Sequence, residues 1–250
     1  MRLYEFDTPN TLSEGPNDPN IFKAVFMAGG PGSGKSYVAK QLFGGFPGLK
    51  TLNSDDVYEI LMGKADMALD PASIFSPRGQ EIRNRAKGIS DTQDQLYRLG
   101  RLGMIIDGTG KDVEKIGKLK IRLDALGYDT MMVFVNTDID TAQRRNQMRA
   151  RKLASDEVQK MWNAVQQNIG RFQRMFGNNM IVYDNSSDDD DPGQVSDVSK
   201  RIREFMSSPP TKKQAKDWLA NADKTNANFA QQDKAQKAAT IAATKKEPTQ

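Results

Sequence analysis

Short apolar runs alternate with amphipathic segments along most of the chain. Each run is followed by glycine or polar residues, which is typical of buried strands. The intervening segments repeat apolar residues at helical spacing, so strands and helices alternate. This pattern predicts an α/β fold of three layers, α/β/α, with helices on both faces of a five-stranded parallel sheet. The predicted strands are residues 21–28, 49–53, 104–107, 130–136 and 180–183.

Helical spacing is clear in several of the intervening segments. A helix is expected from Lys35, another over residues 112–126, and a long one over residues 155–176. The long one places its apolar side chains on one stripe, which we interpret as core packing. Residues 70–103 form an insertion between the second and third strands and are predicted to be helical from about Gln80.

A glycine-rich octamer follows the first predicted strand and precedes the first predicted helix. It reads GGPGSGKS and matches the pattern GxxxxGK[ST] in full. Glycines permit positive φ and close approach, so successive N–H groups can surround a phosphate at a helix N-terminus. Lys35 would reach the β- and γ-phosphates, and the hydroxyl of Ser36 would ligate Mg²⁺. The predicted phosphate-binding residues are Gly29, Gly30, Pro31, Gly32, Ser33, Gly34, Lys35 and Ser36.

Carboxylates follow the second and third predicted strands. Asp55 and Asp56 come just after the second strand, at the edge of the sheet where the phosphate loop is expected. One of them can accept the proton of an attacking hydroxyl, and the other can hold substrate or orient metal-bound water. The alternative is that both only cap the next helix. Asp107 ends the third strand, where an acid can hydrogen-bond to water on Mg²⁺.

A cluster of positive charge follows the fourth predicted strand. Five cations fall within the nine residues from Arg144 to Lys152, and no acid lies among them. Arg145 and Arg149 are four residues apart and would share a helix face. Planar, permanently charged donors suit a transferring phosphoryl group, so we interpret the segment as a helical lid whose donors include Arg151. The alternatives are a solvated basic helix or a nucleic-acid patch.

Composition narrows the chemistry. The 250 residues include no cysteine and no histidine, which excludes disulfides, thiolate metal sites and imidazole catalysis. Acid–base work must then fall to carboxylates, lysines or tyrosines. The first twenty residues are polar and no long apolar run occurs, so we expect a cytoplasmic protein without membrane contact.

Charge divides the chain into unequal parts. The net charge is +4, and residues 209–250 alone carry eight Lys against four Asp or Glu. Residues 1–208 are therefore formally neutral. We expect a flexible arm over 1–20, one domain over 21–208, and a basic, disordered tail over 209–250. Within the domain, the acidic run 188–191 is interpreted as a solvated loop.

Three stretches resemble known kinases that carry this type of phosphate loop. Residues Phe46 to Asp56 resemble the segment between the phosphate loop and the catalytic aspartate of phage polynucleotide 5′-kinases. Arg145-Asn146 and Arg149 resemble the lid of those enzymes. Asp107-Gly108-Thr109 resembles the end of the third strand in zeta-toxin kinases. The likeness extends over about residues 21–185.

Both families imply a P-loop NTPase-type core with a five-stranded parallel sheet, ATP with Mg²⁺, and a catalytic base at Asp55. They imply different acceptors. Polynucleotide kinases carry an arginine three residues after that aspartate, and this chain has Tyr58 there. If the chain is encoded by a phage, the resemblance implies a location in the host cytoplasm.

We therefore expect an ATP-dependent kinase that transfers the γ-phosphoryl group to a hydroxyl. Three acceptor classes stay open: a nucleic-acid 5′ end, a nucleotide sugar and a small metabolite. Two other classes of protein stay open as well, namely an ATPase module without an acceptor and a nucleic-acid-binding protein that uses its lysine-rich tail. The expected catalytic residues are Lys35, Asp55, Arg145, Arg149 and Arg151, and the expected Mg²⁺ residues are Ser36 and Asp107.

Overall fold

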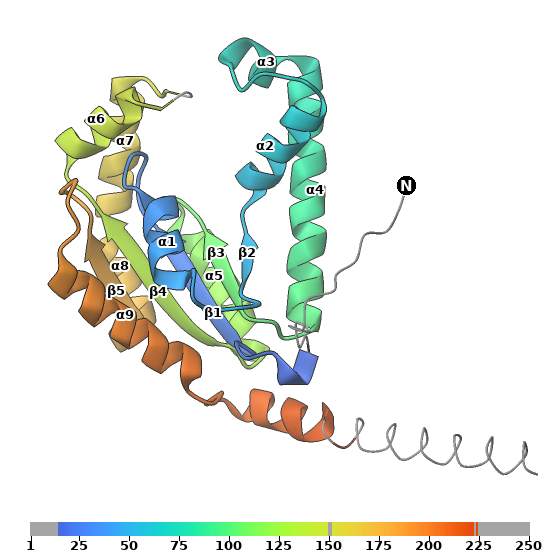
Figure 1. Ribbon diagram of the computed structural model, residues 1–250. Coiled ribbons are helices and arrows are strands. Elements are labelled where there is room, and N and C mark those ends of the chain that lie inside the picture. The colour runs from blue at the N-terminus through green and yellow to red at the C-terminus, as the bar shows by residue number, and fades with distance from the viewer. Residues whose placement is uncertain (1–14, 150–151, 223, 225–250) are drawn as a thin grey trace, which may run out of the picture.

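The computed structural model describes residues 15–149, 152–222 and 224. Within this part of the chain lies a sheet of five parallel strands with helices on both faces (Figure 1). The fold class predicted from the alternating pattern is confirmed. The strands are β1 (Lys23–Ala28), β2 (Lys50–Leu52), β3 (Met104–Asp107), β4 (Asp129–Asn136) and β5 (Met180–Asp184).

The order of the strands brings several loops together. The order is β2-β3-β1-β4-β5, so β1 lies in the middle of the sheet. Val25 on β1 is in register with Ile105 on β3 and with Met131 on β4. Because all the strands are parallel, their carboxyl ends meet at one edge of the sheet. The loops that follow β1 to β4 converge at this edge and position the candidate site.

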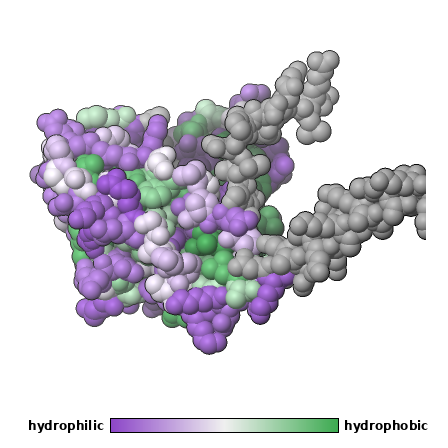
Figure 2. All heavy atoms as spheres, turned by 60° about the horizontal axis from the view of Figure 1, so that its bottom comes forward, coloured by the Kyte–Doolittle hydropathy of each residue, from purple (hydrophilic) through white to green (hydrophobic). Residues whose placement is uncertain are grey.

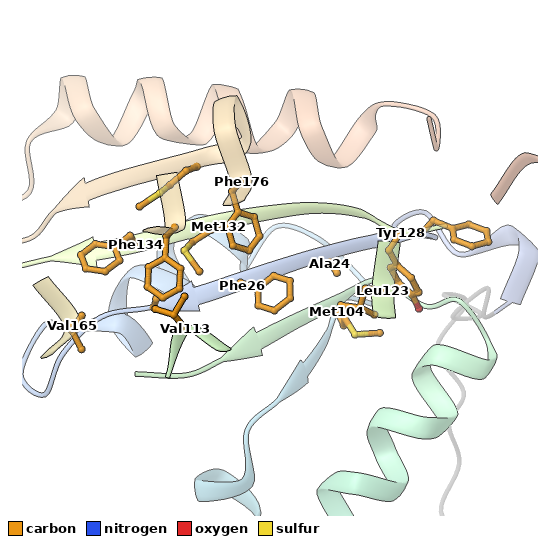
Figure 3. Packing of buried hydrophobic residues seen from close by; sticks show 14 of the residues in the cluster. Ala24, Phe26, Met104, Val113, Leu123, Tyr128, Met132, Phe134, Val165 and Phe176 are labelled. Atoms are coloured by element: carbon orange, nitrogen blue, oxygen red, sulfur yellow. The ribbon is translucent and has the colours of Figure 1, made fainter. Parts of the chain in front are cut away.

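Alternation along β1 divides the core between the two faces of the sheet. The covering helices include α1 (Lys35–Phe43), α5 (Val113–Ala125), α8 (Ile169–Phe176) and α9 (Pro192–Ser207). Val25 and Met27 point to the face covered by α1 and α9. Phe26 points to the other face and packs edge-on against Phe176 of α8, with ring centroids 5.3 Å apart (Figure 3). Every residue of β1 is buried, which explains why residues 24–28 of this central strand form a continuous apolar run.

Two helices replace the single helix predicted over residues 155–176. Helix α7 (Ser155–Gln166) ends before α8 begins, and Asn168 lies at the break. The buried side chain of Asn168 donates hydrogen bonds to the carbonyl oxygens of Gly110 and Lys111 at 2.9 and 3.0 Å. The prediction of one helix is wrong. The apolar periodicity continues through the break, whereas the contact between Asn168 and the loop at Gly110 and Lys111 does not show in the periodicity. The apolar stripe does pack against the sheet, as predicted.

The segment between β2 and β3, which includes the predicted insertion, forms a helical hairpin that stands beside the sheet (Figure 1). Its helices are α2 (Ser54–Lys64), α3 (Pro71–Phe75) and α4 (Pro77–Leu99). Helix α4 begins earlier than the predicted start at Gln80, because the Ser76 hydroxyl caps it and accepts from the Gly79 N–H at 3.0 Å. The hairpin has a small core of its own, made of Tyr58, Met62, Ile74, Ile82 and Ala86.

The chain continues to pack after α9. Ala215 is fully buried, and the ring of Trp218 lies edge-on to Phe22 with centroids 5.6 Å apart. Thr211 anchors this segment, because its N–H and its hydroxyl both donate to the Asp129 carboxylate. The packed domain therefore extends beyond the expected boundary at residue 208.

Packing at the other end also starts before the expected boundary. Asn20 is buried, and its side chain donates to the Pro47 carbonyl oxygen at 2.8 Å. Residues 1–14 of the expected arm lie outside the described residues, as do residues 223 and 225–250 of the expected tail.

Apolar side chains are gathered mainly in the layers on either side of the sheet. The face brought forward in Figure 2 is mostly hydrophilic, with small, separate hydrophobic areas. Across the described ranges, no helix combines the length and the apolar character needed to span a bilayer.

Replacing Trp218 by Ala is expected to lower the free energy of unfolding by about 1–3 kcal/mol, because the partly buried ring loses its contact with Phe22. Urea denaturation followed by the fluorescence of Trp162 measures this change. Lys216→Ala, on the exposed side of the same segment, is the matched control and should change stability by less than about 0.5 kcal/mol. Equal stabilities of the two variants would contradict a stabilising role for this segment.

Candidate active site

The glycine-rich octamer forms the loop between β1 and α1. Gly32 and Gly34 adopt left-handed backbone conformations, with φ of 74° and 80°. A Cβ atom on Gly32 would lie 2.3 Å from the carbonyl oxygen of Ala142, and one on Gly34 would lie 2.3 Å from the side-chain amide of Asn185. Glycine meets both the conformation and the close contact at these positions. The phosphate loop is thus pressed against the segments that follow β4 and β5.

Asn185 joins the phosphate loop to the end of β5. Its side-chain amide donates to the Ser33 carbonyl oxygen at 2.7 Å. Its own carbonyl oxygen accepts from the Thr137 hydroxyl at 2.8 Å and from the Arg145 guanidinium at 2.7 Å. Asn185 therefore fixes the loop, the end of β4 and the predicted lid in one arrangement. Sequence patterns did not indicate this residue, because a lone asparagine 152 positions from Ser33 carries no local signal.

Lys35 is the electrostatic centre of the site. Its ammonium nitrogen donates to the Gly29 carbonyl oxygen at 3.0 Å. Burial lowers the pKa of Lys35. The carboxylates of Asp107 and Asp55 oppose this shift, whereas the Arg149 guanidinium adds to it. The Lys35 ammonium, which follows β1, therefore interacts with charged groups from three other parts of the chain: the first turn after β2, the end of β3 and the segment after α6.

Asn53 organises the neighbouring aspartates. Its side-chain oxygen accepts from the Asp55 N–H at 2.9 Å and caps α2. Its amide nitrogen donates to Asp56 at 2.9 Å and to Asp107 at 3.1 Å. The cap of α2 is therefore Asn53, and both aspartate side chains lie within the first turn instead. Sequence analysis identified the carboxylates but not the asparagine that links Asp56 to Asp107.

Asp107 is the most enclosed of the three carboxylates. Its Oδ1 is buried and has no hydrogen-bond partner among the described residues. Burial raises the pKa of Asp107; the Lys35 ammonium opposes the rise, and the carboxylates of Asp56 and Asp55 add to it. Burial and repulsion from Asp55 also raise the pKa of Asp56. A buried, unpaired carboxylate oxygen beside other carboxylates suits a bound cation.

The residues around Asp107 fit Mg²⁺. Ser36, Asp56 and Asp107 are among the residues that line a cavity of about 280 Å³. In the part of the chain that the structure describes, no three His, Cys, Asp or Glu side chains are grouped to hold a metal ion by themselves. Mg²⁺ does not need such a cage, because it keeps several waters and binds through one or two carboxylates together with phosphates.

The predicted lid lies across the phosphate loop from the helical hairpin. Helix α6 (Ile139–Gln147) stands on the side opposite α2 (Figure 1). Arg145 and Arg149 line a second cavity of about 280 Å³ together with the phosphate loop. The prediction that these two arginines share a helix face is wrong, because α6 ends before Arg149. Arg151 lies outside the described residues.

The acidic run after β5 contacts this lid. Asp188 accepts hydrogen bonds from Arg144 at 2.5 Å and from Arg145 at 3.1 Å, and these contacts lower the pKa of Asp188. Asp190 accepts from the Tyr37 hydroxyl on α1 at 2.8 Å. The run is exposed, as interpreted from the sequence, but it also connects the lid to α1. Its partners lie far away along the chain, so the sequence showed only its charge.

The sheet order, the loop after β1 and the flanking helices together define a P-loop kinase-like α/β fold. Residues 25–174 match the model of the AAA domain family. The match covers more than half of the chain, and the chain therefore belongs to this family. None of the curated proteins compared with the chain matches it.

The chain is similar to several solved structures at low sequence identity. AvrRxo1-ORF1:AvrRxo1-ORF2 with sulphate ions is 14% identical, with a TM-score of 0.51 over 76% of this chain and 65% of that one. A gluconokinase from Sinorhizobium meliloti 1021 is 12% identical, with a TM-score of 0.43 over 75% of this chain and 93% of that one. The Pnkp1/Rnl/Hen1 RNA repair complex is 18% identical, with a TM-score of 0.47 over 62% of this chain and 48% of that one.

Replacing Asp107 by Asn is expected to raise the thermal unfolding midpoint near neutral pH, measured without nucleotide or Mg²⁺. The fold raises the pKa of Asp107, so the ionised carboxylate destabilises the folded state above that pKa. A gain of about 1 kcal/mol would correspond to about 2–4 °C for a chain of this size. As the pH falls through the folded-state pKa, the carboxyl binds a proton and the difference between the two proteins should shrink.

Calorimetry of both proteins from about pH 8 to about pH 4 checks this expectation. Asp91→Asn, on the exposed surface of α4, is the matched control and should leave the midpoint unchanged. A gain that grows as the pH falls would contradict the assigned direction of the Asp107 pKa.

Proposed function

We propose that the chain is an ATP-dependent kinase that transfers the γ-phosphoryl group of ATP to a hydroxyl group. The observation that carries the proposal is the electrostatic neighbourhood of Lys35. Asp55, Asp107 and Arg149 all act on its ammonium group. Phosphoryl transfer needs a phosphate-binding loop with its lysine, a base, an acid that orients the metal ion, and a cationic lid.

The phosphate loop is the proposed site for the β- and γ-phosphates. Backbone N–H groups at the N-terminus of α1 supply the donors, and the Lys35 ammonium supplies a positive charge. Mg²⁺, when bound, would neutralise negative charge on the transferring group, with Ser36 and Asp107 as its protein partners. Two observations support this assignment. Asp107 lines the same cavity as Ser36. Its buried Oδ1 has no hydrogen-bond partner among the described residues.

Asp55 is the proposed general base. Asp55 is exposed in the first turn of α2. Its carboxylate, like that of Asp107, interacts electrostatically with the Lys35 ammonium. The acceptor oxygen forms a bond to the γ-phosphorus, the bond from that phosphorus to the β–γ bridging oxygen breaks, and ADP leaves. Asp55 takes the proton of the acceptor hydroxyl, so the atoms and charges balance.

The arginines of the lid have distinct proposed roles. Arg149 would stabilise the γ-phosphoryl oxygens, because it lines the same cavity as the phosphate loop. Arg145 would support the lid, since its guanidinium already donates to the carbonyl oxygens of Asn185 and Ser187 at 2.7 Å each. Arg151 is proposed as a further donor.

The acceptor is proposed to bind on the hairpin side of the phosphate loop, because Asp55 belongs to α2 and α2 stands opposite the lid (Figure 1). The resemblance to polynucleotide 5′-kinases and zeta-toxin kinases keeps three acceptor classes: a nucleic-acid 5′ end, a nucleotide sugar and a small metabolite. An ATPase module without an acceptor would not need a carboxylate after β2, so Asp55 favours the kinase.

Replacing Asp55 by Asn is expected to lower acceptor-dependent transfer by about 10²–10⁴-fold, because the hydroxyl loses its base, while affinity for Mg·ATP is unchanged. Transfer of label from γ-labelled ATP into pooled hydroxyl compounds measures turnover, and calorimetric titration measures affinity. ATP hydrolysis without an acceptor is measured in parallel. Lys35→Ala is expected to weaken Mg·ATP binding itself.

Glu59→Gln is the matched control, because Glu59 is exposed on the same helix one turn beyond Asp55. It should keep full transfer activity. Full activity of Asp55→Asn would exclude Asp55 as the base. ATP hydrolysis that no hydroxyl compound diverts into transfer would favour the ATPase module.

A further inference from the structure

Arg83 on α4 is a partly buried cation that has no anionic partner within the described part of the chain. Its guanidinium lies over the ring of Tyr58 on α2, 4.7 Å from the ring centroid. It forms no hydrogen bond or ion pair with any residue in the described ranges, and its Nε is buried. Arg98 on the same helix is different, since it pairs with Asp94 at 2.5 Å.

Tyr58 adds a second unused polar group at the same place. Its side chain is 2% exposed, and its hydroxyl has no hydrogen-bond partner among the described residues. A buried polar group without a hydrogen-bond partner destabilises the folded state, so native structures contain few such groups. The guanidinium over this ring and the hydroxyl that the ring carries offer several donors and a permanent positive charge, which together recognise an anion.

Asp55, the proposed base, lies close in the helix to Tyr58, whose ring Arg83 covers. Asp55 precedes Tyr58 by three residues on α2, so the two side chains are neighbours on successive turns of the helix. One turn spans about 5 Å. A molecule whose hydroxyl lies at Asp55 would therefore have a second group, at about that distance, near Tyr58 and the partly exposed Arg83. The phosphates of ATP are assigned elsewhere, to the phosphate loop.

We propose that Arg83 and the Tyr58 hydroxyl bind an anionic group of the acceptor, either a phosphate or a carboxylate. This inference rests on the kinase function proposed above and narrows its substrate. The acceptor class is a hydroxylated molecule with an anionic group about one helical turn from the reacting hydroxyl. Neutral alcohols and unmodified sugars lack the group that Arg83 pairs with.

The test uses the Arg83 Nε–H as a direct probe in ¹⁵N NMR spectra of the full chain. Burial of the Nε–H slows its exchange with water, and its signal is assigned as the one that Arg83→Gln removes. Inorganic phosphate and acetate are titrated separately, in a Lys35→Ala background that weakens the phosphate loop. Saturable movement of the Arg83 signal is expected. A larger response to phosphate or to acetate distinguishes phosphorylated from carboxylic acceptors.

Two further variants separate binding from folding. Tyr58→Phe keeps the ring and removes the hydroxyl, so it should preserve the fold and weaken anion binding by about tenfold. Arg85→Gln, exposed on α4 two residues from Arg83, is the matched control and should leave the affinity unchanged. An Arg83 signal that neither anion moves would overturn the inference. Equal losses of affinity in Tyr58→Phe and Arg85→Gln would overturn it as well.

This readout does not depend on turnover. Anion binding at Arg83 without any phosphoryl transfer would support the anion site and count against the kinase. Transfer to neutral hydroxyl compounds that Arg83→Gln leaves unchanged, with no movement of the Arg83 signal, would support the kinase and reject the anion site.

Discussion

The contact between the phosphate loop and the segments that follow β4 and β5 is the constraint on which the rest of the site depends. Two glycines in left-handed conformations allow the loop backbone to approach Ala142 and the Asn185 side chain more closely than any Cβ would permit. The loop, the lid and the β5–α9 connection are therefore held by the same few contacts. A change in one of them displaces the donors that the proposed chemistry needs.

Charge is the second organising feature of the site. The fold lowers the pKa of Lys35 and raises the pKa of Asp107, so each group is less stable in its ionised form than it would be in water. Their mutual attraction offsets part of this cost. Shifted pKa values of this kind are common at functional sites, where a ligand of opposite charge stabilises the ionised groups. A polyanion at Lys35 and a cation at Asp107 would relieve both.

Sequence reasoning was strongest where a feature is local. The five strands and the position of the phosphate loop follow from apolar runs and from one octamer, and the structure confirms the predicted fold. It was weakest where a contact with a residue far away in the sequence determines the local structure. The break at Asn168, the end of α6 before Arg149 and the packing of Trp218 all depend on partners that periodicity does not show.

By itself, the sequence determined the alternation of strands and helices, the glycine pattern of the phosphate loop and the acids that follow β2 and β3. These features depend on backbone preferences and on residue types within a few positions of one another. Tertiary structure alone decided that Asn53 bridges two aspartates, that Asn185 holds the loop, and that Arg83 lies over the ring of Tyr58. Such pairings arise when parallel strands bring remote loops to one edge, and a linear pattern contains no record of that approach.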